Sequence, residues 1–111
     1  GGIVQGIGWM TMEEIIYNEA GKLLSNALST YKIPDIYAVP KILDVKFLNT
    51  DGNSMAILKS KAVGEPPLMY GIGAYFAIRN AVLAFNPASD ISYSAPITPE
   101  KVLMGLYSNG K

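Results

Sequence analysis

The stretch Ser60-Lys-Ala-Val-Gly-Glu-Pro-Pro-Leu68 is followed directly by Met69-Tyr-Gly-Ile-Gly-Ala-Tyr-Phe-Ala-Ile-Arg-Asn-Ala-Val-Leu-Ala-Phe-Asn86. From Leu68 to Phe85, apolar residues recur at helical spacing and cover more than one face. This pattern predicts one helix over residues 67–86 that is buried on several sides, with Arg79 as the charge in its body. The Asn86-Pro87 step is predicted to end the helix.

Glu65 stands immediately before this helix and is followed by Pro66 and Pro67. Pro66 disfavours helical geometry at Glu65, so we expect the helix to begin no earlier than about Pro67, with Pro66 extended. The helix N-terminus favours the carboxylate charge, whereas burial among apolar neighbours opposes it. A carboxylate held stiffly in this way suits a general base, and a plain helix-end acid is the alternative. Lys61 is open to a similar alternative, a solvated lysine at the end of a strand.

The composition of the 111 residues excludes several classes of chemistry. There is no cysteine, which rules out disulfides, thiolate zinc sites and iron–sulfur ligation by this chain. There is no histidine, so a serine–histidine triad is impossible within it. Nine basic and nine acidic residues give a formal net charge of zero, which provides no electrostatic footprint for nucleic acid.

The chain carries more apolar residues than a small domain can bury. Hydrophobic residues make up 50% of it and charged residues only 16%. We therefore expect it to pack against further protein, and its start at Gly1-Gly2 suggests a piece of a longer chain. No signal peptide and no apolar run of spanning length is evident, so we expect a cytoplasmic protein without membrane contact.

The N-terminal residues 2–14 are predicted to form a helix from their apolar spacing. Glycine is unfavourable inside a helix, yet Gly2 and Gly6 lie four residues apart and share one face. Close packing of that face against another backbone is one interpretation, and close approach to a bound ligand is the other.

The middle of the chain is predicted to contain short antiparallel hairpins. Residues 14–17 and 22–25 flank a turn at Asn18–Gly21, and residues 29–40 are expected to be ordered but irregular. Residues 41–48 alternate as a half-buried strand, a turn follows at 49–53, and residues 55–61 are expected to return as its partner. Thr98-Pro99-Glu100 marks the start of a last helix that runs to about Tyr107. The fold class is therefore α+β, with hairpins flanked by about three helices.

Four motifs resemble one family of enzymes. Lys61-Ala-Val-Gly-Glu-Pro-Pro-Leu68 resembles the active-site glutamate motif of the xanthine dehydrogenase/oxidase family of molybdenum hydroxylases. Val4-Gln-Gly-Ile-Gly8 with Glu13-Glu14, Ser29-Thr-Tyr-Lys-Ile-Pro34 and Ser94-Ala-Pro-Ile-Thr-Pro-Glu100 match the same family in order and spacing. The likeness covers nearly the whole chain, which resembles the C-terminal end of the molybdopterin-binding subunit, with residues 1–111 as one fragment.

The resemblance implies a specific chemistry. In that family the glutamate corresponding to Glu65 takes a proton from a hydroxide on molybdenum, and the oxygen attacks an electron-poor carbon of the substrate. It implies that Gln5, Val63 and Gly64 contact the molybdopterin, and that no residue here binds the metal. For Gln5 the alternative is a helix-end side chain that bonds the backbone. Iron–sulfur clusters, FAD and NAD would lie in other parts of the complete enzyme, and the chain's partners would be those parts and a purine substrate.

The resemblance also leaves functions open. The family's catalytic subunit is several times longer, and its substrate-clamping arginine lies outside this chain. Arg79 is not expected to replace that arginine, because it lies in the middle of the predicted helix. The fragment alone is therefore expected to be inactive. Ser29–Pro34 favours xanthine-type substrates, with an aldehyde oxidase or another heterocycle hydroxylase as the alternative. A non-catalytic packing domain of the same ancestry is the second alternative.

Overall fold

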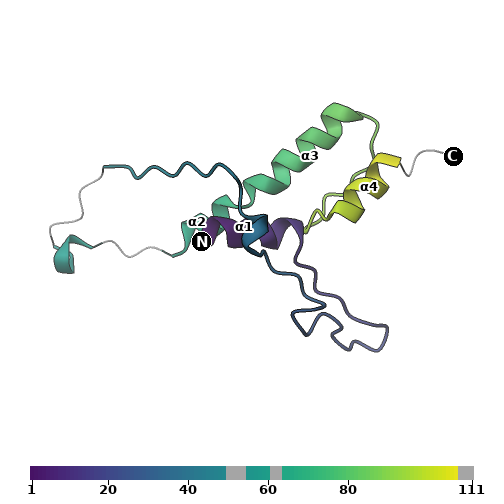
Figure 1. The fold of residues 1–111 in the computed structure, drawn as a ribbon, viewed down its shortest axis with the longest axis horizontal. Helices are drawn as coiled ribbons and strands as arrows, with labels where there is room; N and C mark the ends of the chain where they lie inside the picture. The colour runs from purple at the N-terminus through teal and green to yellow at the C-terminus, as the bar shows by residue number, and fades with distance from the viewer. Residues whose placement is uncertain (50–54, 61–63, 108–111) are drawn as a thin grey trace.

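The computed structural model describes residues 1–49, 55–60 and 64–107, and within them the regular structure is helical. The elements in chain order are α1 (Gly2–Thr11), η1 (Ile36–Ala38), η2 (Ile57–Lys59), α2 (Pro66–Tyr70), α3 (Gly73–Phe85) and α4 (Pro99–Tyr107), where η marks a short 3₁₀ helix. The four α-helices gather in one body, from which two long connections project (Figure 1).

Glycines bring α1 and α2 into direct backbone contact. A Cβ atom built on Gly6 would lie 2.1 Å from the carbonyl oxygen of Leu68, and one built on Gly71 would lie 2.5 Å from the Cα of Gly6. Both glycines are buried. The interpretation of the Gly2/Gly6 face as a close-packing face is therefore confirmed, because only residues without side chains allow this approach.

The helix predicted over residues 67–86 is divided into α2 and α3. Between them the backbone stays right-handed, with φ of −57° at Gly71 and −56° at Ile72. Around this junction Ile72, Ala74 and Tyr75 donate to carbonyls three residues earlier, the hydrogen-bond spacing of a 3₁₀ helix. The local tightening ends α2 just where Gly71 meets α1.

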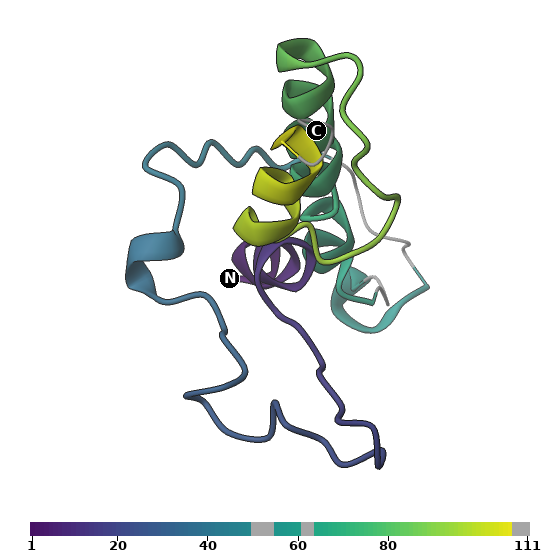
Figure 2. The same cartoon turned by 90° about the vertical axis from the view of Figure 1, so that its right-hand side faces the viewer.

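The buried apolar cluster lies where α3 faces the segment before α4. Tyr75 and Val82 of α3 pack with Ile91 and Ile97. Arg79 donates to the carbonyl oxygen of Ile91 at 2.7 Å, and its guanidinium lies 4.7 Å from the centre of the Tyr93 ring. Arg79 thus fixes the connection between α3 and α4, and Figure 2 shows α4 lying alongside α3 and above α1.

The last helix confirms its predicted start. Thr98 is buried, and its hydroxyl accepts a hydrogen bond from the backbone N–H of Lys101 at 3.3 Å. Pro99 is the first helical residue and Glu100 lies in the first turn, where an acid favours the helix dipole. At the other end of the chain, α1 stops at Thr11, three residues before the predicted end.

The predicted strands do not form within the described residues. The first hairpin is reduced to a single antiparallel bridge, Tyr17 to Leu23, around a turn in which Gly21 adopts a φ of 75°. Residues 41–48 belong to no strand, and the turn at 49–53 falls mostly outside the described residues. The return segment contains η2 instead, with Leu58 at a φ of 53°, which a strand excludes. Alternation shows that a segment has two faces, but a strand also needs a paired neighbour. The α+β class remains a prediction for the complete protein.

The segment Pro66–Phe85 is long and apolar enough to cross a membrane by length and composition alone, with a mean hydropathy of 1.3. This differs from the expectation that no run reaches that length. In the structure it contacts α1 through Gly71 and the Ile91 carbonyl through Arg79. Of its residues only Gly71, Tyr75 and Val82 are buried, so the prediction of one helix buried on several sides is wrong for this chain by itself.

Candidate functional site

Glu65 occupies the N-cap position of α2, which confirms its predicted place just before a helix start. Its φ is −111° and its ψ is 68°, outside helical geometry. The helix begins at Pro66, one residue earlier than predicted, so the expectation of an extended Pro66 is wrong. The fixed φ of proline suits the first position of a helix, where the missing N–H costs no hydrogen bond.

The Glu65 carboxylate lies against the first turn of α1. A Cβ atom built on Gly2 would lie 3.2 Å from Oε1 of Glu65 and 3.1 Å from Cβ of Pro67. The Glu65 side chain makes no capping hydrogen bond to α2, and it is exposed. No hydrogen bond or ion pair to its carboxylate is found among the described residues.

An open hollow of about 460 Å³ adjoins this carboxylate. Its lining residues are Gly64, Glu65, Pro66, Leu68, Met69 and Tyr70. Glu65 supplies the charge and the other side chains are largely apolar. Around Gly64 the space is open, since a Cβ built there would meet no atom within 4 Å among the described residues. The structure thus brings two of the predicted site residues, Glu65 and Gly64, to one hollow.

Gln5 lies on a different hollow. It is exposed on α1 and lines a cavity of about 600 Å³ together with Val4, Ile33 and Pro34. Pro34 belongs to the Ser29–Pro34 motif and packs where Gly8 has no side chain, 2.1 Å from a Cβ built there. Val63 and Lys61 lie outside the described residues.

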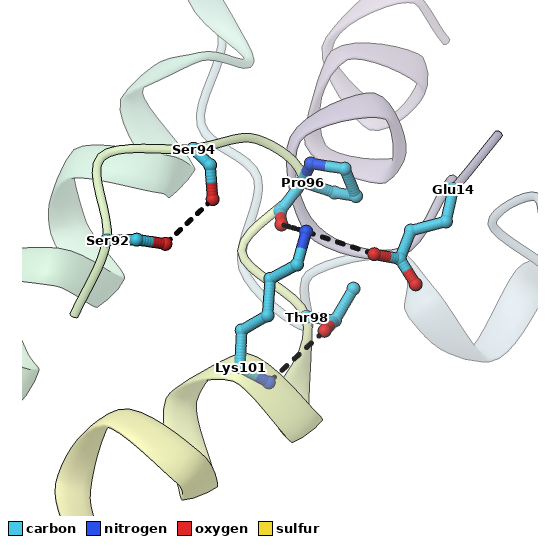
Figure 3. Close-up of polar contacts among 6 residues, drawn as sticks. All are labelled: Glu14, Ser92, Ser94, Pro96, Thr98 and Lys101. Carbon is cyan, nitrogen blue, oxygen red and sulfur yellow. Dashed lines mark hydrogen bonds and ion pairs between the residues drawn. The ribbon is translucent and has the colours of Figure 1, made fainter. Parts of the chain in front are cut away.

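Just after α1, Glu13 and Glu14 form a hydrogen bond and an ion pair that the sequence did not predict. The Tyr31 hydroxyl donates to the Glu13 carboxylate at 2.5 Å. The Lys101 ammonium lies 3.0 Å from Glu14 and donates to the carbonyl oxygen of Pro96 at 2.8 Å (Figure 3). The adjacent acids Glu13 and Glu14 after an apolar helix indicated that such contacts could form. Their partners could not be predicted, because they lie far along the chain.

These contacts explain why the four motifs occur together. Each of the other three meets α1: the Glu65 motif at Gly2 and Gly6, the Ser29–Pro34 motif at Gly8, and the Ser94–Glu100 motif at Met10. The Ser29–Pro34 motif also meets Glu13, two residues beyond the end of α1. The contact at Met10 is a hydrogen bond of 2.7 Å from the Ile97 N–H to the Met10 carbonyl. α1 is thus the common support of the site.

The contact with Glu13 changes the pKa of the Tyr31 hydroxyl. The hydrogen bond to Glu13 raises the pKa of Tyr31 above its ordinary value, and desolvation and the negative charge of Glu13 raise it further. A raised tyrosine pKa keeps the hydroxyl protonated as a donor. The Ser29–Pro34 motif is therefore fastened to α1 throughout the neutral pH range.

Comparison with known proteins gives consistent matches. Residues 1–40 match the family described as the molybdopterin cofactor-binding domain. The chain is 38% identical to xanthine dehydrogenase of Dictyostelium discoideum over 98% of its length, and 41% identical to xanthine dehydrogenase/oxidase of Rattus norvegicus over 92%. It is also 40% identical to aldehyde oxidase 1 of Oryctolagus cuniculus over 94% of its length. In each case the chain spans 8% of the relative's length.

Proposed function

The chain belongs to the xanthine dehydrogenase/oxidase family of molybdenum hydroxylases, and from this premise we propose that it supplies the general base of such an enzyme. Glu65 is the proposed base. The proposed reaction is hydroxylation of a purine at an electron-poor carbon, carried out by the complete enzyme and not by this chain alone.

The observation that carries the proposal is the state of the Glu65 carboxylate. It is exposed at an open hollow, held by a fixed backbone and free of any ion pair or hydrogen bond among the described residues. A general base must reach the proton that it abstracts and must have a free acceptor oxygen. Glu13 and Glu14 do not meet this requirement, because Tyr31 and Lys101 already occupy their carboxylates.

The residues present fit a cofactor with a hydrogen-bonding edge. The Gln5 side chain is exposed and offers both amide donors and an acceptor, and among the described residues no atom lies within 4 Å of a Cβ built on Gly64. Because Gln5 and Gly64 line different hollows, a cofactor held by both would extend from one hollow to the other. We propose that Gln5, Gly64 and Val63 hold the molybdopterin, with no residue of this chain on the metal. When bound, the cofactor supplies the oxygen-transfer and electron chemistry, and this chain supplies position and proton transfer.

In the proposed mechanism Glu65 removes one proton from the attacking oxygen as it bonds to the substrate carbon. The carbon–hydrogen bond at that carbon breaks, and its two electrons would pass into the redox chemistry that the bound cofactor would supply. The carboxylate then holds the proton taken from the oxygen at Oε1 or Oε2 until solvent takes it. The apolar residues Pro66, Leu68 and Met69 line the open hollow beside it. Iron–sulfur clusters, FAD and NAD are proposed to lie in other parts of the enzyme, together with the rest of the molybdopterin-binding subunit.

Aldehyde oxidation is the second candidate function. The relative from Oryctolagus cuniculus, named aldehyde oxidase 1, is as similar to this chain as the xanthine dehydrogenases are. Steady-state turnover of xanthine against an aromatic aldehyde on the complete enzyme distinguishes the two. Preference for the purine is the expected result.

Glu65→Gln in the complete enzyme tests the base assignment. Turnover should fall by about 10²–10⁴-fold, because the amide keeps the shape of the side chain but cannot take up a proton. Molybdenum content and melting temperature should stay at the parental values, since Glu65 caps α2 without a side-chain hydrogen bond. The matched control is Glu19→Gln, which changes an exposed acid in the turn after α1 and should leave turnover unchanged.

Two results would count against the proposal. Turnover within about threefold of the parent lies far below the loss expected for a base and would reject that role for Glu65. A loss of turnover in proportion to a loss of molybdenum would mark Glu65 as a structural acid and favour the non-catalytic packing domain.

A further inference from the structure

We propose that Gly2 is a positioning residue for Glu65: the absence of a side chain at Gly2 determines where the Glu65 carboxylate lies. This inference rests on the proposed role of Glu65 as the base. It assigns to the first turn of α1 the function of positioning the Glu65 carboxylate.

The geometry at Gly2 is close and one-sided. A Cβ atom built there would lie 3.1 Å from Cβ of Pro67, 3.2 Å from Oε1 of Glu65 and 3.4 Å from the backbone nitrogen of Leu68. The first two separations are tighter than ordinary van der Waals contact. The missing side chain at Gly2 therefore leaves the space beside the carboxylate and the first turn of α2 unfilled.

Glu65 has no other support among the described residues. It caps α2 without a side-chain hydrogen bond. Its backbone is fixed between Gly64 and the proline pair, but the last bonds of a glutamate side chain rotate readily. The carboxylate thus lies where a side chain at Gly2 would crowd it, and the space that Gly2 leaves open admits this position.

The position of α1 relative to α2 is set elsewhere, which separates packing from positioning. Gly6 meets Leu68 and Gly71 one turn further along, where added Cβ atoms would approach backbone atoms to between 2.1 and 3.0 Å. That contact fixes the two helices together. Gly2 lies at the other end of the same face, so a methyl group there presses chiefly on the end of one flexible side chain and on one proline ring.

Gly2→Ala in the complete enzyme is therefore expected to move the carboxylate by a few tenths of an ångström without separating the helices. Because a misplacement of about 1 Å can cost about 10²-fold in rate, we expect kcat to fall by about 3–10-fold. KM should stay within about twofold. The control is Gly73→Ala, at the start of α3, where an added Cβ meets no atom within 4 Å among the described residues and kcat should not change.

A double-mutant cycle tests whether Gly2 acts through Glu65. In the Glu65→Gln background, Gly2→Ala should have no further effect on the residual turnover, because the carboxylate that it displaces is gone. An equal fold-loss in both backgrounds would overturn the inference, since it would show that Gly2 acts on the enzyme by another route. Near-parental turnover of Glu65→Gln alone would instead reject the base assignment, so the two failures are distinguishable.

Carboxyl labelling gives a second measurement that does not depend on turnover. The cofactor-free protein is treated with a water-soluble carbodiimide and glycine ethyl ester, and modification of the Glu65 peptide is followed by mass spectrometry. Gly2→Ala should change the labelling rate of Glu65 by at least about twofold and leave that of Glu19 unchanged, whereas Gly73→Ala should change neither. An unchanged Glu65 rate in Gly2→Ala would overturn the inference, whatever the activity.

Discussion

At the residue scale, Tyr31 and Glu13 form a contact that joins a distant motif to α1. Tyr31→Phe removes the hydroxyl that donates to the Glu13 carboxylate at 2.5 Å and should cost about 1–2 kcal/mol of stability, the range for a hydrogen bond to a charged group that is partly exposed. Thermal melting at pH 8 checks this value. Tyr37→Phe is the control, because Tyr37 is 92% exposed.

The same contact predicts a pH dependence. Since the pKa of Tyr31 is raised in the folded chain, its contribution to stability is complete below the ordinary tyrosine pKa of about 10 and is lost as the pH rises through the higher folded value. The melting temperature of the parent should therefore fall more steeply above pH 10 than that of Tyr31→Phe. Equal slopes for the two proteins would show that the hydrogen bond does not affect stability.

Single residues were predictable where local geometry decides. The place of Glu65 followed from two prolines, whose effect on the chain reaches only one residue in each direction. The close-packing glycines of α1 were recognised because glycine four residues apart in a helix needs a reason. The partners of Glu13 and Glu14 were not predictable, because Tyr31 and Lys101 are brought to them by the path of the chain.

At the scale of elements, the contact between α1 and α2 depends on Gly6. Gly6→Ala would place a Cβ atom 2.1 Å from the Leu68 carbonyl oxygen and 2.9 Å from the Cα of Gly71, both of them backbone atoms that cannot turn aside. We expect a net destabilisation of up to about 2 kcal/mol, since overpacking costs about 1–3 kcal/mol and alanine recovers about 1 kcal/mol of helix propensity.

The measurement is the thermal melting of two single variants, Gly6→Ala and Gly73→Ala, each made separately in the same parent protein. Gly73→Ala should raise the melting temperature slightly, because it gains helix propensity without a contact. If Gly6→Ala also raises the melting temperature, the two helices do not meet through this glycine and the arrangement of α1 and α2 is wrong.

Elements were predictable where their ends carry their own signals. α4 begins as Thr98-Pro99-Glu100 predicts, because the cap, the proline and the acid all act within one turn. The division between α2 and α3 was missed; it falls at Gly71, which lies against Gly6 of α1, a contact between segments far apart in the sequence. Residues 41–48 alternate but lack a paired strand among the described residues, and alternation alone cannot supply one.

At the scale of the whole molecule, the chain is too extended to be a self-sufficient domain. Its radius of gyration is 18.4 Å, whereas a compact domain of this length has about 13 Å. Within the described residues only Tyr75, Val82, Ile91 and Ile97 form the buried apolar core. Phe47 and Leu48 are 93% and 87% exposed. They belong to residues 39–49, which follow η1 and form part of the projecting connection between η1 and η2 (Figure 1). Such surfaces are normally covered by further protein.

We therefore expect the isolated chain to self-associate or to bind hydrophobic dyes strongly. Phe47→Ser combined with Leu48→Ser should reduce both effects and leave the melting temperature unchanged, because these side chains contribute almost nothing to the core of the chain by itself. Sedimentation velocity at micromolar concentration, together with 8-anilinonaphthalene-1-sulfonate fluorescence, measures the two properties on each protein. A compact monomer with a radius of gyration near 13 Å and weak dye binding would show that the chain buries these residues on its own.

In the complete enzyme the same double substitution should lower the melting temperature, because each large apolar side chain that becomes buried contributes about 1.5–3 kcal/mol. The contrast between the two proteins identifies the projecting connection as a surface that the rest of the enzyme covers.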